Sequence, residues 1–354
     1  MRVLPLLLLF VVLPLGGNEE GKLLPASMVQ LPAESMTLRG VLTEIDKTGN
    51  QTDYRNRQGS GSADLLLKGL PTKPTPYWTL IDHVARDANL RTVLQPAEGD
   101  QPARLLLTSI AGDARPALRP SCVKGPFKLI IAEAARLADD QAKLALRFNL
   151  RWEPKLNPIW MRPGPLQIRA VDGPWKRTED ASTAVIRLRG LSAGVWSTQL
   201  PIPPDASALE LEGELRLLVS TGRLRLSPAT LFPGAKVAKE GVELDIQSID
   251  VRADLREWVV QLLLRYPKAT FDLESHQGWA LGDLPGELAE AGPNPARYRT
   301  ANPAQVSIDE SRGIRLTYLF KDVPAQGPSV LTISVPAPPV EQDLPLKFEK
   351  IPLR

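Results

Sequence analysis

The sequence predicts an α+β fold, in which a small duplicated helix-strand unit at the N-terminal end is followed by antiparallel β-rich, sandwich-like regions. Three observations predict it. Apolar residues recur at helical spacing in two segments that lie 39 residues apart. Beyond Pro96 the spacing changes to the alternation that is typical of strands. The 34 prolines are spread along the chain, which favours many short strands over long helices.

The composition is that of a globular protein with more than one domain. The chain has 354 residues, of which 43% are hydrophobic, enough for two or three domains with apolar cores. Charged residues make up 23% and the formal net charge is +3. Because no strong field of one sign results, we expect no nucleic-acid partner and no electrostatic attachment to a membrane.

The first residues predict export. Arg2 precedes the uncharged run LPLLLLFVVLPLGG, which is shorter than a membrane span and is interrupted by Pro5 and Pro14. These features are typical of a secretory signal peptide, which we place at residues 1–17, followed by a polar linker at 18–27. The mature protein is therefore predicted to be secreted, periplasmic or in the cell envelope, with no stable membrane span after cleavage.

The first helix-strand unit is predicted between residues 28 and 55. A short strand is expected over Met28–Leu31, and a helix over Leu38–Thr48 ends before Gly49. The segment Gln51–Arg55 is then predicted to be a strand. The helix is indicated by four apolar residues at positions i, i+3, i+4 and i+7: Leu38, Val41, Leu42 and Ile45.

The second unit, Leu65–Leu94, repeats this order as strand, helix and strand. Thr75 is predicted to cap the helix and Pro76 to occupy its first turn. A shift of 39 residues places Leu38 on Tyr77 and Asn50 on Asn89. The two units together are predicted to form one small α+β domain over residues 28–96. The apolar stripe of the second helix consists of Tyr77, Leu80, Ile81, Val84, Ala85 and Ala88.

The pattern of residues 28–96, with an amphipathic helix before Gly-Asn, a strand and then a second helix-strand unit, resembles the short N-terminal domain of secretins and TonB-dependent receptors. The resemblance implies a periplasmic domain that contacts other proteins. Nothing downstream resembles a secretin pore or an outer-membrane barrel, so the resemblance does not imply the signalling or transport roles of that family.

Residues 97–172 are predicted to form a β-rich region that ends at a polar boundary, Asp172–Ser182. Strands are expected at Arg104–Ile110 and Leu144–Trp152, while Phe127–Ala138 fits either a strand or a helix. Two shorter strands are expected at Ile159–Arg162 and Leu166–Val171, between prolines.

Residues 183–354 are predicted to form a β-sandwich-like domain. Its segments alternate between apolar and polar residues, so each strand has one polar face, as in antiparallel sheets packed face to face. The arrangement is roughly immunoglobulin-like, and Leu281–Pro303 is predicted to be a long loop rich in Gly, Pro and Ala. The alternating segments are 209–219, 242–246, 258–266, 314–320 and 330–335.

Three stretches of the chain resemble a group of uncharacterised exported proteins of planctomycete bacteria. They are TPYWTLIDHVARDANL, LRFNLRWEPKLNPIWMRP and the ending DLPLKFEKIPLR. The resemblance implies export and a β-rich body, and it implies no activity.

The sequence offers few residues for chemistry. It lacks the motifs of a phosphate, dinucleotide or zinc site, so no cofactor and no metal are predicted. Glu274, His276 and Trp279 lie close together in the sequence and are weak candidates for a ligand-binding site. His83 is predicted to be a surface residue, and Cys122, the only cysteine, a buried hydrophobe.

The remaining clusters of carboxylates and the tryptophans are predicted to have structural roles. The carboxylates of Glu210, Glu212 and Glu214 alternate along one strand and are predicted to form its solvated face. Most of the seven tryptophans are expected in the core, while Trp160, Trp175 and Trp279 lie nearer turns and are candidates for exposure.

We therefore predict a non-catalytic exported protein that works as a protein-protein interaction or envelope binding module. The partner is expected to be an envelope or extracellular protein, or another copy of the chain. Two alternatives stay open. One is a polysaccharide-directed hydrolase that uses carboxylates or His276, and the other is a structural component of the envelope.

Overall fold

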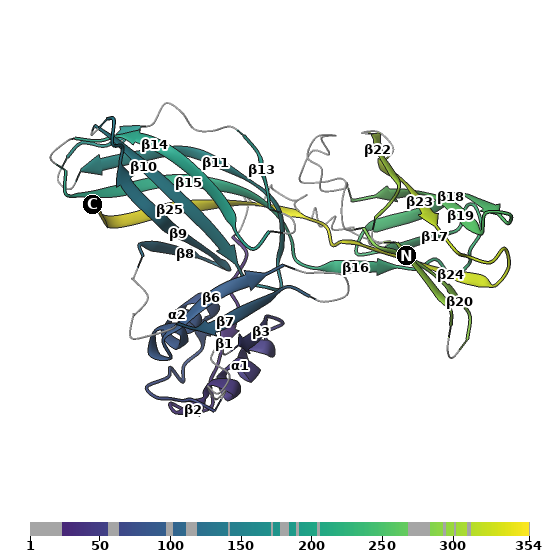
Figure 1. Cartoon of the computed structure of the whole chain (residues 1–354), viewed down its shortest axis with the longest axis horizontal. Helices are drawn as coiled ribbons and strands as arrows, with labels where there is room; N and C mark the ends of the chain where they lie inside the picture. Colours follow the sequence, from purple (N-terminus) through teal and green to yellow (C-terminus); the bar gives the residue numbers. More distant parts are fainter. Residues whose placement is uncertain are drawn as a thin grey trace, which may run out of the picture.

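The computed structural model describes a small helical head and two β-sandwiches (Figure 1). The predicted signal peptide and the first part of the linker lie outside the described residues. These are 23–55, 64–96, 102–110, 119–140, 142–170, 173–177, 184–188, 191–203, 206–267, 284–292, 295–300, 302–309 and 313–353.

The head, which we define as the described residues from Leu23 to Ile110, confirms the duplicated helix-strand unit. A shift of 39 residues carries β2 onto β5, the start of α1 onto that of α2, and β3 onto β6. The helices bury the apolar stripes that the sequence predicted. The elements of the head are β1 (Met28–Val29), β2 (Met36–Thr37), α1 (Leu38–Asp46), β3 (Gln51–Arg55), β4 (Leu66–Leu67), β5 (Thr75–Pro76), α2 (Tyr77–Asp87), β6 (Leu90–Gln95) and β7 (Arg104–Ser109).

The two repeats of the head exchange their entry strands. The strand that leads into the first helix, β2, pairs with β4 of the second repeat, and β5, which leads into the second helix, pairs with β1 of the first. Each helix therefore starts directly from a strand that is held by the other repeat. This exchange ties the two repeats into one folding unit.

The two helices begin differently. Thr37 caps α1, because its side chain accepts a hydrogen bond of 3.1 Å from Gly40 N. The predicted cap of α2 by Thr75 is wrong. Thr75 is paired with Val29 in the β1–β5 ribbon, and its hydroxyl donates to the Lys73 carbonyl instead.

The head has a three-stranded sheet in the order β3-β7-β6. β7 runs parallel to β3 and antiparallel to β6. This central strand lies beyond residue 96, where we had ended the N-terminal domain, so the sheet continues to Ser109. The repeat in the sequence did not indicate this, because β7 follows the two repeats and is not part of either.

The first sandwich follows the head. Phe127–Arg136, for which the sequence left helix or strand open, is a strand with alternating burial. The two segments predicted at 159–162 and 166–171 belong to one strand, β11, with register shifts near its prolines. One sheet has the order β14-β10-β9-β8 and the other β12-β11-β15-β25, with β13 also on β11. The bounds are β8 (Ser121–Lys124), β9 (Phe127–Arg136), β10 (Lys143–Trp152), β11 (Asn157–Ala170), β12 (Lys176–Arg177), β13 (Ile186–Arg187), β14 (Gly194–Pro201), β15 (Ala208–Ser220) and β25 (Val340–Pro352).

The second sandwich is inserted in the chain between two neighbouring strands of the first, β15 and β25. The chain leaves the first sandwich after Ser220 and returns to it at Val340, where β25 pairs along β15. The region predicted as one domain at 183–354 is thus divided between both sandwiches. The boundary predicted at 172–182 does not separate two domains, since β14 and β15, which follow it in the chain, pair with β10 and β11, which precede it.

The second sandwich packs a sheet of order β16-β24-β20-β21 against one of order β17-β18-β19-β23-β22. The loop predicted at 281–303 is wrong in part, because β20 and β21 form a hairpin there with Leu288 fully buried. The bounds are β16 (Arg223–Leu226), β17 (Lys236–Lys239), β18 (Val242–Arg252), β19 (Glu257–Arg265), β20 (Gly286–Glu290), β21 (Arg297–Thr300), β22 (Gln305–Asp309), β23 (Gly313–Phe320) and β24 (Pro328–Pro336).

Two apolar cores hold these parts together. One is continuous through the head and the first sandwich. The other fills the second sandwich and includes Ile159, Trp160 and Leu218 from the first. Trp160, which we had considered a candidate for exposure, is 3% exposed, because its side chain packs in the core of the second sandwich. Within the described residues, neither helix has the length and apolar character that crossing a membrane requires.

Candidate functional site

The residues predicted for ligand binding, Glu274, His276 and Trp279, lie outside the described residues. His83 is half-buried on α2, with Nε2 3.2 Å from an oxygen of Asp87 one turn later. Cys122 is a free, buried thiol in the core of the first sandwich, as predicted. Neither residue belongs to a cluster of reactive groups in the described part of the chain, where no set of three or more His, Cys, Asp or Glu could hold a metal ion.

Two carboxylates of the row on β15, Glu210 and Glu212, are paired with cations. Arg169 on β11 donates from Nε to Glu210 at 2.7 Å, and Lys347 on β25 lies 3.5 Å from Glu212. These are cross-strand ion pairs between neighbours in one sheet. They stabilise the sheet and leave Glu210 and Glu212 poorly suited to act as a hydrolytic pair.

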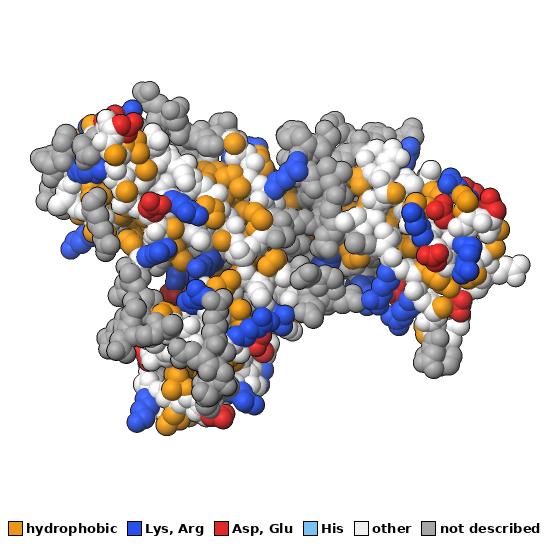
Figure 2. All heavy atoms as spheres, in the orientation of Figure 1, with side chains coloured by type: hydrophobic (Ala, Val, Ile, Leu, Met, Phe, Trp, Pro, Cys, Tyr) orange, Lys and Arg blue, Asp and Glu red, His pale blue; other side chains and the backbone are white. Residues whose placement is uncertain are grey.

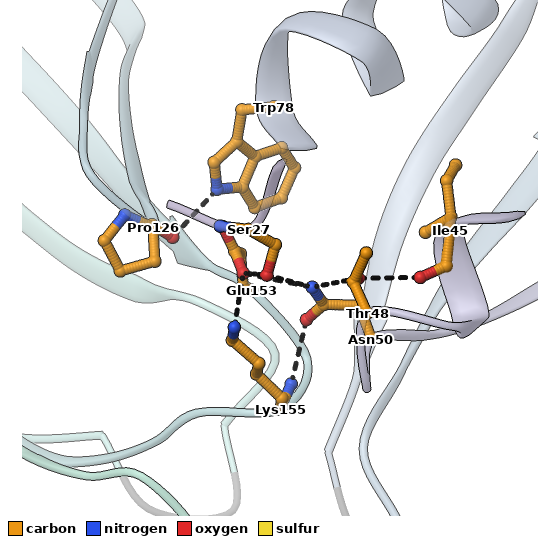
Figure 3. A network of polar contacts seen from close by, with 8 residues as sticks. All are labelled: Ser27, Ile45, Thr48, Asn50, Trp78, Pro126, Glu153 and Lys155. Atoms are coloured by element: carbon orange, nitrogen blue, oxygen red, sulfur yellow. Dashed lines mark hydrogen bonds and ion pairs between the residues drawn. The ribbon is translucent and has the colours of Figure 1, made fainter. Parts of the chain in front are cut away.

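A network of buried polar contacts lies where the head meets the first sandwich (Figure 3). Its centre is Glu153, which follows β10 directly and is 0% exposed. One carboxylate oxygen accepts a hydrogen bond of 2.8 Å from Ser27 N, and the other accepts from the Ser27 hydroxyl and, at 3.0 Å, from Asn50 Nδ2. Lys155 Nζ lies 3.6 Å from the second oxygen. A buried charge of this kind is stable only when it is bonded in this way.

Asn50 links the carboxylate to the end of α1. It is fully buried, and its amide nitrogen also donates to the hydroxyls of Ser27 at 2.8 Å and Thr48 at 3.1 Å. Its side-chain oxygen accepts from Lys155 N at 3.2 Å, and Thr48 donates to the Ile45 carbonyl at 2.7 Å. The network therefore runs from the last turn of α1 to the connection after β10 (Figure 3).

Further contacts surround this centre. Trp78 on α2 donates from Nε1 to the Pro126 carbonyl at 2.9 Å. Lys128 on β9 forms an ion pair with Asp82 on α2 and lies 5.9 Å from the centroid of the Trp78 ring. These contacts attach α2 to the first sandwich, as Asn50 attaches the end of α1.

Burial changes the electrostatics of the junction. The pKa of Tyr77 is raised well above its ordinary value, first by burial and then by the negative charges of Glu153 and Asp46. Its hydroxyl has no hydrogen-bond partner among the described residues. Burial also lowers the pKa of Arg151, whose Nη1 donates to Thr92 on β6 at 2.6 Å.

The arrangement is a clamp between two parts of the protein. The acceptor positions of Glu153 are occupied by Ser27, Asn50 and Lys155, so the carboxylate has its bonding partners within the chain. The cluster fixes the orientation of the head relative to the first sandwich. Sequence reasoning missed it, because Ser27, Asn50 and Glu153 are far apart in the chain and each is unremarkable locally. Only the repeat, which aligns Asn50 with Asn89, singled out one member.

Comparisons with known proteins leave the family open. No family model matches the chain, and no curated protein matches it. Among solved structures, it is similar to a conserved domain protein from Bacillus anthracis, with 8% identity, a TM-score of 0.19 and coverage of 66% of this chain and 90% of that one. It is also similar to the C-terminal globular domain of an oligosaccharyltransferase from Pyrococcus abyssi, with 9% identity, a TM-score of 0.17 and coverage of 66% and 48%.

Proposed function

We propose that this is a non-catalytic exported binding protein, whose head contacts another protein of the cell envelope or the extracellular space. The observation that carries the proposal is a pair of adjacent, exposed leucines on the head. Leu65 and Leu66 are 43% and 54% exposed, although most large apolar side chains of the head are buried. Exposed apolar side chains that lie together are typical of protein-binding surfaces.

The position of these leucines suits contact with a partner. Leu66 pairs with Thr37 of β2, and β2 lies at the end of the head that points away from both sandwiches (Figure 1). Hydrophobic side chains are visible at this end of the molecule in the space-filling view (Figure 2). A partner can therefore approach Leu65 and Leu66 without touching the sandwiches.

The repeat supports the same interpretation. The entry strands β1 and β4 have the same burial pattern, an exposed first residue and a buried second one. The exposed residues are Met28 and Leu66. Both repeats thus present an apolar side chain at the same place, next to the start of a helix.

The clamp around Glu153 gives this surface a fixed direction. A rigid binding surface loses little conformational entropy when a partner binds, which favours affinity. The resemblance of residues 28–96 to the short N-terminal domain of secretins and TonB-dependent receptors, and the predicted signal peptide at 1–17, are the basis for proposing an envelope partner.

The test is a capture experiment with the full chain and an envelope extract. We expect a protein that is retained by the wild type and is lost with Leu66→Glu. The matched control is Leu255→Glu, because Leu255 is also an exposed leucine, at 59%, but lies on the second sandwich. Equal retention by the wild type and both variants would contradict the proposal, as would recovery of the native protein from the cytosol.

A further inference from the structure

A strand at the edge of a sheet has unpaired backbone N–H and C=O groups that can bind another strand. Natural proteins prevent this with charged side chains, prolines, bulges or very short edge strands. In the sheets of three or more strands that the structure describes, most edge strands carry such protection. Charged residues occur in β3, β6, β8, β12, β16, β17, β21, β22 and β25.

The exception is β14, an edge of the sheet β14-β10-β9-β8. Its sequence, GVWSTQLP, is eight residues long and contains no charged side chain. It pairs with β10 from Gly194 to Pro201 without a register shift, so no bulge bends this edge. Only Pro201, at its end, lacks a backbone donor.

Two side chains of β14 anchor this edge in the core of the sandwich. Trp196 points into the core, where its ring stacks on Phe148 with 4.6 Å between centroids, and Leu200 is fully buried. Val195, Ser197 and Gln199 face outward and are exposed. Because Trp196 and Leu200 hold the strand against the core, an added strand meets a preformed template.

We infer that β14 pairs with β14 of a second copy of this chain, antiparallel across a two-fold axis. In such an interface residue i of one copy lies opposite residue j of the other, and j lies opposite i, so a charge near the axis lies close to its own copy. β14 is compatible with this arrangement because it has none. The pairing would join two four-stranded sheets into one of eight strands, with Val195, Ser197 and Gln199 on its outer face.

β14 lies on the side of the first sandwich that faces away from the head. In Figure 1 the head lies below the first sandwich, next to β8 and β9, while β14 lies on the upper side. The order of the sheet agrees, since β8 and β14 are its opposite edges. A copy bound at β14 would therefore not cover Leu66, and both heads would remain accessible.

The test is the mass of the purified full chain in a dilution series, measured by analytical ultracentrifugation. We expect a wild-type dimer. Ser197→Lys and Val195→Lys place like charges near the two-fold axis, so each is expected to weaken the dimer by about tenfold or more. The matched control is Ser121→Lys, because Ser121 is exposed on β8, the opposite edge of the same sheet.

A dimer that is lost in both β14 variants and kept in Ser121→Lys, with unchanged circular dichroism, supports the inference. A monomeric wild type overturns it, and so does a dimer that persists in the β14 variants or is lost in all three. The result is independent of the capture experiment, which depends on the head.

Discussion

The head and the second sandwich are both attached to the first sandwich, but by different means. The head is attached around a buried carboxylate, Glu153, with bonds from Ser27, Asn50 and Lys155. The second sandwich is attached by packing, since Ile159, Trp160 and Leu218 of the first sandwich are part of its core. The junction of the head combines a continuous apolar core with a buried polar network, whereas the junction of the second sandwich is largely apolar.

The chain connectivity explains the difference. The second sandwich is joined to the first by two crossings of the chain, after Ser220 and before Val340. These crossings are held side by side, because the Ser220 hydroxyl donates to the Ala337 carbonyl at 3.0 Å and Ala337 N donates to Gly222 O at 2.9 Å. The head is joined to the first sandwich by the chain that follows Ile110. Directional hydrogen bonds can fix its orientation where covalent connections do not.

The largest effect is expected from removing the apolar anchor of the second junction. Trp160→Ala should lower the free energy of unfolding by about 4 kcal/mol, because a large buried side chain leaves a cavity. Hydrogen exchange should show lost protection in β16 and β24 and unchanged protection in the head. Equal loss in the head would mean that the two junctions are not independent.

A somewhat smaller effect is expected at the polar junction. Glu153→Ala should cost about 3 kcal/mol, because it leaves the buried donors of Ser27 and Asn50 without an acceptor. Protection should be lost mainly in α1 and at Asn50. The matched variant Glu153→Gln keeps the shape and should restore part of the stability, measured by urea unfolding. A loss below about 0.5 kcal/mol for Glu153→Ala would show that packing alone holds the head.

The smallest effect at neutral pH is expected from Tyr77→Phe, which removes a buried hydroxyl without a described partner. The stability should change by less than about 1 kcal/mol. Because the folded-state pKa of Tyr77 is raised, its contribution is present below the unfolded pKa of about 10 and is lost as the pH rises through the folded value.

The wild type should therefore lose stability above about pH 10 more steeply than Tyr77→Phe. Urea midpoints on both sides of that pH measure the difference. Burial also raises the pKa of Tyr318, which is present in both proteins. The variant should therefore still lose some stability at alkaline pH. Parallel curves for the two proteins would show that Tyr77 does not ionise on unfolding in this range.

The spacing of apolar residues along the sequence predicted the positions of helices and strands better than it predicted which strands pair. The helix α1 and the strand β3 were expected within a few residues of where they lie, because burial of Leu38, Val41 and Ile45 on one side requires helical spacing. The same reasoning gave the alternating strand β10. It missed the hairpin of β20 and β21, where Gly and Pro conceal short strands whose stability comes from burial of Leu288.

The candidate site was less predictable than the fold. The carboxylate that matters most, Glu153, stands beside Pro154 in a connection, and its burial depends on Ser27 and Asn50, more than 100 residues earlier. For the same reason Trp160 was considered a candidate for exposure. Its environment is supplied by a sandwich formed later in the chain.

The sequence by itself determined the duplicated helix-strand unit and the β-rich character of the rest, because the periods of 3.6 and 2 are properties of single segments. Only the tertiary structure decided which strands became neighbours. It placed β7 inside the head, returned β25 to the first sandwich, buried Glu153 and left β14 at an uncharged edge. Each of these results depends on contacts between segments that are distant in the chain. The spacing of residues within one segment gives no information about the free energy of such contacts.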